Sequence, residues 1–166
     1  MEGPFLNIVL FEPEIPYNTG NIARLCVGLN CRLHLIEPLG FKLTDKMIKR
    51  AALDYWKYLD YRIYSSLEKF FTENPLEDFF FASTRSATVY YDAQFSRGDF
   101  IFFGKESGGL PEVFHTLHRE KGILIPMTDK IRSLNLCNSA AVVMYEALRQ
   151  NNKSDVPEKP AFTKFK

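Results

Sequence analysis

The sequence has few residues of the types that build disulfide frameworks or zinc sites. It contains three cysteines and three histidines among its 166 residues. Cys26, Cys31 and Cys137 include no CxxC pair, and the histidines are not grouped with them. An odd number of unpaired cysteines argues against a disulfide framework, and scattered Cys and His residues argue against a zinc site. We therefore expect no metal cofactor and a protein of a reducing compartment, the cytoplasm.

The sequence also lacks long apolar runs and an excess of one charge. No run approaches the roughly 20 apolar residues of a membrane span, and the N-terminus does not show the basic-then-apolar order of a signal peptide. We expect no membrane partner. Because the formal net charge is only +1, any nucleic-acid binding must depend on a local basic patch.

Length and composition are typical of one compact domain. With 46% hydrophobic and 25% charged residues, the chain can bury one sizeable core, whereas two full domains would be cramped. No internal repeat or linker divides it, and only the end of the sequence has the Pro- and Lys-rich composition of a mobile terminus. We predict a single domain over residues 1–152 and a flexible tail over residues 153–166.

Short apolar strand patterns alternate with helical patterns along the domain. Apolar runs and turn residues predict strands over residues 5–11, 32–36, 58–64, 79–83, 100–103 and 122–125. Apolar spacing and capping residues predict helices within residues 18–30, 44–53, 65–74 and 135–150. This alternation of strands and helices indicates an α/β domain.

The last predicted helix, residues 135–150, has an unusually broad apolar stripe. Leu136, Ala140, Val143 and Ala147 share one face, and further apolar residues beside them extend the stripe to about half of the circumference. One sheet face normally covers less than that. We therefore expect part of this helix to lie at a subunit interface.

Three polar loops follow predicted strands. They are PYNTGNIAR at residues 16–24, GKESGGLP at 104–111 and PMTDKIRSLNLCNSA at 126–140. Ligands of α/β sheets bind at the carboxyl edge of the strands, where such loops gather. The glycines of residues 104–111 would let the backbone approach a ligand closely, although, taken alone, they fit a tight strand-to-helix turn better. Their order matches neither GxxxxGK[ST] nor GxGxxG, which argues against nucleotide hydrolases and dehydrogenases.

Arg24 is a candidate ligand-binding residue in the first of these loops. It follows Gly20 and Asn21 by one helical turn, near the expected positive start of its helix, where backbone and side chain could hold a phosphate or a ribose together. A solvated helix arginine is the alternative interpretation.

Three polar residues crowd the start of the last helix. Helix capping explains one of Asn135, Asn138 and Ser139 but hardly all three, so the surplus suggests a site. Tyr145 lies ten residues after Asn135. Taken alone, it fits a core or interface position better than a catalytic one.

Taken in order, three segments resemble the three motifs of the SPOUT superfamily of RNA methyltransferases. They are NTGNIAR, FFGKESGGLP, and IPM followed by RSLNLCNSAAVVMYEA. The opening LNIVLFEPEIPYNTGNIARLC and the segment RLHLIEPLGF are similar to the minimal SPOUT subfamily, the tRNA wobble-position 2′-O-methyltransferases. The resemblance runs from about residue 6 to residue 150, and three ordered motifs are more specific than any one of them.

The resemblance implies a fold, an assembly and a cofactor. The fold is a SPOUT-type parallel α/β sheet flanked by helices, with a C-terminal trefoil knot that only the resemblance supports, since knots are rare. The assembly is a homodimer with the last helix at its interface. The cofactor is S-adenosylmethionine, bent within the knot and released as S-adenosylhomocysteine. The implied cofactor-binding residues are Ala82, Gly104, Glu106, Gly109, Ile125, Ser133, Leu134 and Asn138.

The implied reaction methylates the ribose 2′-hydroxyl of the tRNA wobble nucleotide, cytidine 34 or 5-carboxymethylaminomethyluridine 34, in the anticodon stem-loop. The methyl group is already electrophilic, so the enzyme must position the hydroxyl and help to remove its proton without a metal. Arg24 matches an arginine that has a base-like role in related enzymes. A guanidinium holds its proton tightly, so we favour phosphate binding by Arg24, with Tyr145 and Asn21 orienting the hydroxyl. The candidate basic surface of the dimer comprises Arg24, Lys46, Lys49, Arg50 and Arg132.

One departure from the subfamily pattern concerns the third motif. Cys137 stands where the subfamily usually has Ser, and Ser139 follows where Ala is common. Because a thiol forms weaker hydrogen bonds than a hydroxyl, Cys137 would loosen this loop.

Two other functions stay open at this point: a SPOUT enzyme that modifies another tRNA or rRNA position, and a dimeric S-adenosylmethionine-binding protein without catalysis. The co-occurrence of three motifs argues against a generic α/β domain with polar turns.

Overall fold

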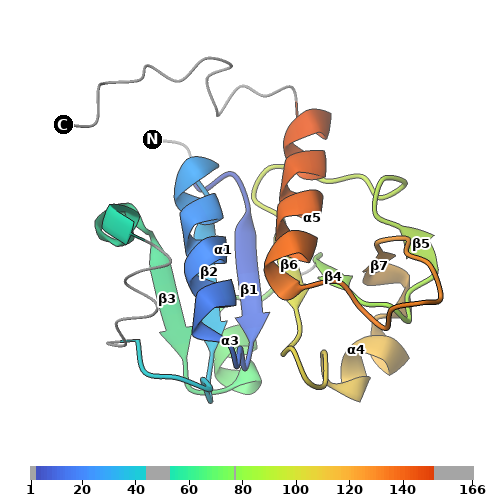
Figure 1. Cartoon of the computed structure of the whole chain (residues 1–166), viewed down its shortest axis with the longest axis horizontal. Helices are drawn as coiled ribbons and strands as arrows, with labels where there is room; N and C mark the ends of the chain where they lie inside the picture. The colour runs from blue at the N-terminus through green and yellow to red at the C-terminus, as the bar shows by residue number, and fades with distance from the viewer. Residues whose placement is uncertain (1–2, 44–52, 77, 152–166) are drawn as a thin grey trace.

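The structure, a computed structural model, describes residues 3–43, 53–76 and 78–151. Within them, one parallel sheet has the strand order β3-β2-β1-β6-β4-β7-β5 (Figure 1). The strands are β1 (Asn7–Phe11), β2 (Arg32–Ile36), β3 (Tyr61–Tyr64), β4 (Phe80–Ala82), β5 (Thr88–Val89), β6 (Phe100–Phe103) and β7 (Gly122–Leu124). The α-helices are α1 (Pro16–Gly28), α3 (Leu67–Glu73), α4 (Glu112–Leu117) and α5 (Leu136–Gln150), and the 3₁₀ helices are η1 (Leu53–Tyr58) and η2 (Arg119–Lys121).

The predicted α/β architecture is confirmed, and the differences lie at the ends of elements. The strand predicted over residues 58–64 is shorter, because η1 includes Tyr58 and β3 begins only at Tyr61. The helix predicted within residues 18–30 begins earlier, at Pro16, since proline suits the first turn of a helix. The two residues of β5 and the six of α4 are too short to show a periodic pattern.

Several predictions fall outside the described residues. They concern the helix over residues 44–53 apart from Leu53, the basic residues Lys46, Lys49 and Arg50, and the tail over residues 153–166. The domain boundary at residue 152 therefore stays a prediction.

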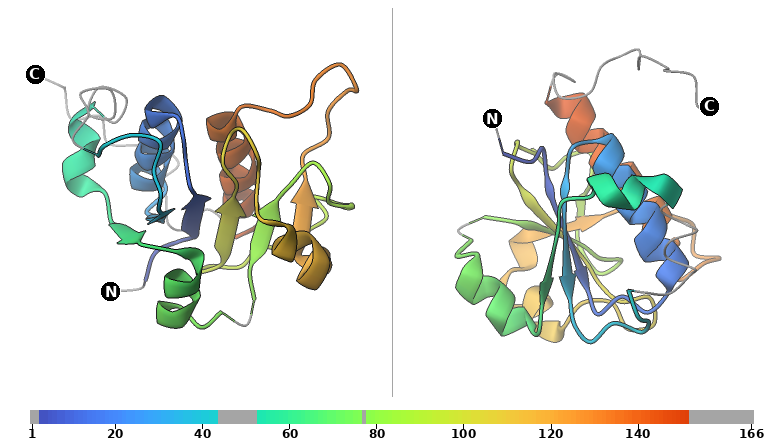
Figure 2. Two further views of the ribbon diagram at one scale, coloured as in Figure 1. Left: turned by 90° about the horizontal axis from the view of Figure 1, so that it is seen from below. Right: turned by 90° about the vertical axis from the view of Figure 1, so that its left-hand side faces the viewer.

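The two faces of the sheet bury different side chains. The face covered by α1 and α5 packs residues such as Ile22, Cys26, Ala140 and Met144 against the sheet. The opposite face, covered by α3 and α4, is rich in phenylalanine. Figure 2 shows the two pairs of helices on opposite sides of the sheet. Because both faces of β1 are covered, its sequence NIVLF is buried throughout.

The strand order creates a switch point beside β1. From β1 the chain runs through α1 to β2 on one side, and from the neighbouring β6 it runs through α4 to β7 on the other. The loops that leave β1 and β6 therefore diverge from adjacent strand ends. In open α/β sheets this divergence leaves a crevice in which ligands bind.

A buried histidine connects the strands away from this edge. His34 is 1% exposed. Its Nε2 lies 3.1 Å from Asn7 Oδ1 and its Nδ1 lies 3.0 Å from the Tyr64 hydroxyl. Asn7 Nδ2 donates to Gly98 O, and Asn74 Nδ2 donates to the Tyr64 hydroxyl. Because the Tyr64 hydroxyl accepts from Asn74, its own proton is free to be donated to His34 Nδ1. The network therefore suits a neutral imidazole that carries its proton on Nε2.

Burial of His34 makes the fold sensitive to acid. Desolvation lowers the pKa of His34 from 6.5 to about 4. An unfolded chain therefore takes up a proton near pH 6.5 that the folded chain resists until about pH 4, so stability falls as the pH falls through this window. We predict that wild-type protein loses on the order of 3 kcal/mol more unfolding free energy between pH 7 and pH 4 than His34→Gln. Urea unfolding at both pH values measures the difference, with the partly exposed His118→Gln as the control, and equal losses in all three proteins would contradict it.

Candidate functional site

A cavity of about 650 Å³ opens at the carboxyl edge of β4, β6 and β7. Its size is within the range of roughly 300–1,000 Å³ that small-molecule sites occupy. Four stretches of chain contribute its walls, together with Ile15 and Asn18 before and within α1. Three of these stretches are residues 82–85, 103–110 and 132–136, the fourth contributes Ile125 and Met127, and His115 and Ser139 complete the lining.

The loop after β6 folds back on itself at the cavity. Lys105 N donates to Gly109 O at 3.2 Å, and Gly109 N donates to Lys105 O at 2.8 Å. Gly109 adopts a φ of 69°, and a Cβ added to Gly104 would lie 2.1 Å from the carbonyl carbon of Gly109. Gly104 is therefore required by the backbone of its own loop, so the tight-turn interpretation of this glycine is confirmed.

Charged and polar side chains tie this loop to the loop that leaves β1. Lys105 Nζ lies 2.8 Å from Glu12 Oε2. Ser107 donates to the Glu14 carboxylate from its hydroxyl at 2.7 Å and from its amide at 2.8 Å. These two bonds, the hydroxyl first, lower the pKa of Glu14. The two sides of the switch point are thus held together across their loops.

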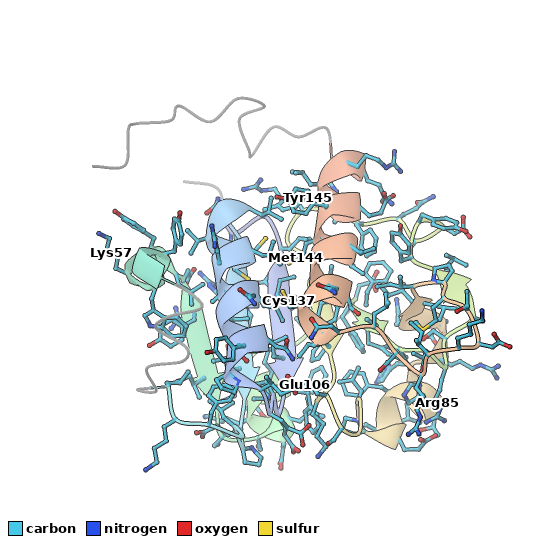
Figure 3. All side chains as sticks on the ribbon, in the orientation of Figure 1. Lys57, Arg85, Glu106, Cys137, Met144 and Tyr145 are labelled. Atoms are coloured by element: carbon cyan, nitrogen blue, oxygen red, sulfur yellow. The ribbon has the colours of Figure 1, made fainter. Side chains whose placement is uncertain are left out.

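Glu106 and Asn18 join all three polar segments that the sequence singled out. The Glu106 carboxylate accepts from Glu14 N at 2.8 Å, Ile15 N at 3.2 Å and Asn18 Nδ2 at 2.8 Å. Asn18 Oδ1 in turn accepts from Asn135 Nδ2 at 2.9 Å. The first turn of α1 has no acidic residue, so Glu106 supplies the negative charge that a helix N-terminus favours. Figure 3 shows Glu106 near the first turns of α1 and α5.

Asn135 also explains most of the polar crowding at the start of α5. Its Oδ1 caps the helix by accepting from the amides of Cys137 at 3.0 Å and Asn138 at 3.2 Å. Ser139 Oγ donates to the backbone oxygen of Asn135. Cys137, the departure from the subfamily pattern, is partly buried, which raises the pKa of its thiol. Its side chain packs against the core on the sheet face that α1 and α5 cover.

The structure brings together most of the predicted cofactor-binding residues. Seven of the eight line the cavity: Ala82, Gly104, Glu106, Gly109, Ile125, Ser133 and Leu134. Asn138 does not line it and is exposed on α5. The Glu106 carboxylate also holds the loop before α1, because it accepts hydrogen bonds from two of its amides.

The three predicted catalytic residues do not line the cavity. Asn21, Arg24 and Tyr145 are exposed on α1 and α5, which lie side by side in Figure 1. The expected position of Arg24 near the start of its helix is wrong, because Pro16 starts α1 and Arg24 is its ninth residue. Its guanidinium instead lies 5.2 Å from the centre of the Tyr55 ring.

Arg24 and Tyr145 nevertheless lie equally far along their helices from a residue that lines the cavity. Arg24 follows the cavity residue Asn18 by six positions, and Tyr145 follows the cavity residue Ser139 by six. Six residues of α-helix span roughly 9 Å. The two side chains therefore extend from helices that both begin at the cavity.

Sequence reasoning missed several cavity residues. Asn18 lies within the first motif, two residues before Gly20, and its role becomes visible only through its hydrogen bonds to Glu106 and Asn135. Arg85 lines the cavity and forms a paired contact with Glu112, at 2.6 and 2.8 Å. The loop after β4 has no glycine or motif pattern that would indicate this residue.

The cavity suits a small ligand with a flat apolar part and several polar groups. Leu110, Ile125 and Leu134 supply apolar wall, and Arg132 supplies positive charge. Within the described chain, no backbone amide between Met127 and Leu134 donates a hydrogen bond to a protein group. These amides can therefore bind ligand oxygens or ring nitrogens. No group of His, Cys, Asp or Glu among the described residues could hold a metal ion.

A parallel α/β sheet with a small-molecule cavity at its switch point is typical of ligand-binding α/β domains, enzymes among them. Residues 5–145 match the SpoU rRNA Methylase family. A tRNA (cytidine(34)-2'-O)-methyltransferase of Aeromonas hydrophila is 46% identical over 146 residues, which cover 87% of this chain and 94% of that protein. The chain therefore belongs to the SpoU rRNA Methylase family, and it is an RNA methyltransferase.

Solved structures agree with this assignment. One described as "Structural insights into the 2-OH methylation of C/U34 on tRNA" has a TM-score of 0.81 and 45% identity over 87% of this chain and 95% of its own. The SpoU methyltransferase AviRb of Streptomyces viridochromogenes, solved in complex with AdoMet, has a TM-score of 0.76 and 22% identity over 93% of this chain and 60% of its own. The second likeness shows a shared fold alone. No helix of the described residues is long and apolar enough to cross a membrane.

Two glycines of the loop after β6, Gly104 and Gly108, provide a matched test of its turn. A Cβ at Gly104 would collide with the backbone of Gly109 at 2.1 Å, whereas a Cβ at Gly108 would meet only the flexible Lys105 side chain, at 3.2 Å. We predict that Gly104→Ala weakens S-adenosylmethionine binding at least about ten-fold and that Gly108→Ala changes it little. Calorimetry measures both affinities, and thermal unfolding checks that each variant is folded. Equal affinities of the two variants would show that this turn does not shape the cavity.

Proposed function

We propose that this chain transfers a methyl group from S-adenosylmethionine to the ribose 2′-hydroxyl of nucleotide 34 of tRNA. The observation that carries the proposal is the near-complete match to relatives named for this reaction. The substrate nucleotide is cytidine or a modified uridine such as 5-carboxymethylaminomethyluridine, and the related solved structure concerns methylation of C/U34. The anticodon stem-loop is then the part of tRNA that the protein binds.

The residues of the cavity fit S-adenosylmethionine. Leu110, Ile125 and Leu134 offer apolar surface to an adenine ring, and the unpaired amides between Met127 and Leu134 suit its nitrogens and the ribose hydroxyls. Arg132 is exposed at the cavity and can attract the cofactor carboxylate. When bound, the cofactor supplies an electrophilic methyl group, and S-adenosylhomocysteine is the product.

Arg24, Asn21 and Tyr145 act on the RNA side of the reaction. Because guanidinium groups are poor proton acceptors, Arg24 binds the phosphate beside the reacting ribose. The Asn21 amide and the Tyr145 hydroxyl orient the 2′-hydroxyl by hydrogen bonding. All three side chains are exposed, which leaves them accessible to a substrate as large as tRNA.

A homodimer explains the apolar residues of α5 that the rest of the domain does not fully bury. Leu136, Ala140, Val143, Met144 and Ala147 are buried against the domain. Beside them, Ala141, Val142 and Leu148 are only partly buried. A second copy that packs on this side of α5 would cover them and would enlarge the basic surface that includes Arg24.

The C-terminal part of the domain forms the trefoil knot of the SPOUT superfamily. After β7, on the far side of β4, the chain returns past the loop of residues 104–110 to place α5 beside α1. This long return around the cavity agrees with a knot, and family membership supports it.

The direct test is to incubate the purified protein with labelled S-adenosylmethionine and undermodified total tRNA, and then to map the labelled nucleoside after nuclease digestion. The proposal expects the label in a 2′-O-methylated nucleotide 34. Label at another tRNA position would replace the proposed substrate, and cofactor binding without any transfer to tRNA would favour another RNA substrate or a non-catalytic protein.

Substitution of Arg24 tests the RNA side of the mechanism. We predict that Arg24→Ala lowers methyl transfer more than about 100-fold because the reacting ribose loses its positioning contact. Cofactor affinity should stay unchanged, since Arg24 does not line the cavity, and the dimer should stay intact in sedimentation. Loss of the contact with Tyr55 costs at most about 1 kcal/mol at an exposed site. Arg119→Ala, an exposed arginine on η2, is the control, and normal turnover of Arg24→Ala would remove this residue from the mechanism.

A further inference from the structure

One edge of the sheet carries exposed tyrosines together with basic side chains. In the described chain β3 is an edge strand, and η1 precedes it and packs against α1. We call this region the η1–β3 surface. It consists of Arg24, Tyr55, Lys57, Tyr58 and Tyr61. Figure 3 shows Lys57 at the opposite end of the molecule from Arg85.

The tyrosines of the η1–β3 surface are held in place but not buried. Tyr58 is 67% exposed and Tyr61 is 38% exposed. The centre of the Tyr61 ring lies 5.3 Å from that of Trp56. Trp56 packs against the core on the sheet face that α1 and α5 cover. The fold therefore fixes this surface without needing the Tyr58 ring in its interior.

Basic groups lie over these rings or beside them. The Lys57 ammonium is 4.9 Å from the centre of the Tyr58 ring, and the Arg24 guanidinium is 5.2 Å from that of Tyr55. Among the described residues, neither Arg24 nor Lys57 forms an ion pair. Asp60 lies on the same stretch of chain, but Arg32 already neutralises it at 2.7 Å. The described charges of this surface are therefore free for a negatively charged partner.

Exposed aromatic rings next to unpaired cations are the combination that binds single-stranded RNA. Unpaired bases stack on tyrosine rings, and lysine and arginine contact the phosphates between them. A protein partner would also use tyrosines, but it would not require several cations without acidic partners. The charge pattern therefore favours RNA over a second protein.

We propose that the η1–β3 surface binds unpaired nucleotides of the tRNA anticodon loop, with a base stacked on Tyr58 and an adjacent phosphate held by Lys57. This inference rests on the proposed function, because Arg24 contributes both to this surface and to binding of the reacting nucleotide. The contact between Arg24 and Tyr55 makes the two sites continuous. Stacking tolerates any base, so this surface holds the loop without selecting its sequence.

The test measures binding of a fluorescent anticodon stem-loop RNA to the full chain by anisotropy. Tyr58→Ala should weaken binding about ten-fold, because one stacking contact is lost. Tyr58→Phe keeps the ring and should bind as wild type does. Lys57→Gln should weaken binding and lower its salt dependence by about one phosphate contact. Tyr91→Ala, a 54% exposed tyrosine in the loop after β5, is the matched control and should bind normally.

Methyl transfer to tRNA separates this inference from the function on which it rests. Tyr58→Ala should raise the KM for tRNA about ten-fold and leave kcat and the cofactor affinity unchanged. If wild type methylates nucleotide 34 and Tyr58→Ala has a normal KM and RNA affinity, the η1–β3 surface is not an RNA site. An equal loss in Tyr91→Ala, or a change in oligomeric state without a change in RNA affinity, would overturn it as well. If wild type does not methylate nucleotide 34, the proposed function fails and the anticodon-loop assignment fails with it.

Discussion

The carboxylate of Glu106 holds together parts of the chain that are otherwise separate. It accepts hydrogen bonds from two amides before α1 and from Asn18, residues that are 88 to 92 positions away in sequence. Through Asn18 the same network reaches Asn135, the N-cap of α5, 117 positions from Asn18. A polar group left without its partner costs roughly 1–3 kcal/mol when buried. The relative position of the loop after β6, the start of α1 and the start of α5 therefore depends on this one side chain and its partners.

The network around Glu106 keeps the proposed RNA-contacting residues outside the cofactor cavity but at a fixed position relative to it. The cavity lies at the carboxyl edge of the sheet, where Gly104 and Gly109 close the loop after β6. The residues proposed to contact RNA, Asn21 and Arg24 on α1 and Tyr145 on α5, lie outside the cavity on helices that begin at its wall. A rigid helix transmits the position of its first turn to a residue roughly 9 Å further along. A domain without a separate RNA-binding module can thus align a ribose with the cofactor by fixing two helix starts.

The order of strands and helices was predictable from the sequence, whereas their arrangement in space was not. Apolar runs such as residues 100–103 identify strands because both faces of a parallel sheet are buried. The placement of β6 between β1 and β4 depends on contacts between residues far apart in sequence, which no local pattern contains. Motif resemblance identified seven cavity residues, but it did not identify Asn18, whose role depends on Glu106 and Asn135. The position of Arg24 was misjudged because the turn-forming residues before Asn18 concealed a helix that starts at Pro16.

The unequal faces of the sheet explain why the proposed functional side chains emerge from one of them. Under the short helices α3 and α4, large rings fill the space, with Phe102 5.3 Å from Phe70 and 5.2 Å from Phe114. Such rings bury enough area for helices of seven and six residues to complete that face. Under α1 and α5, small residues such as Ala23 and Ala140 let longer helices pack closely on the sheet. Because these helices continue beyond the loops that hold the cavity, their outer sides remain available for a second copy of the chain and for RNA.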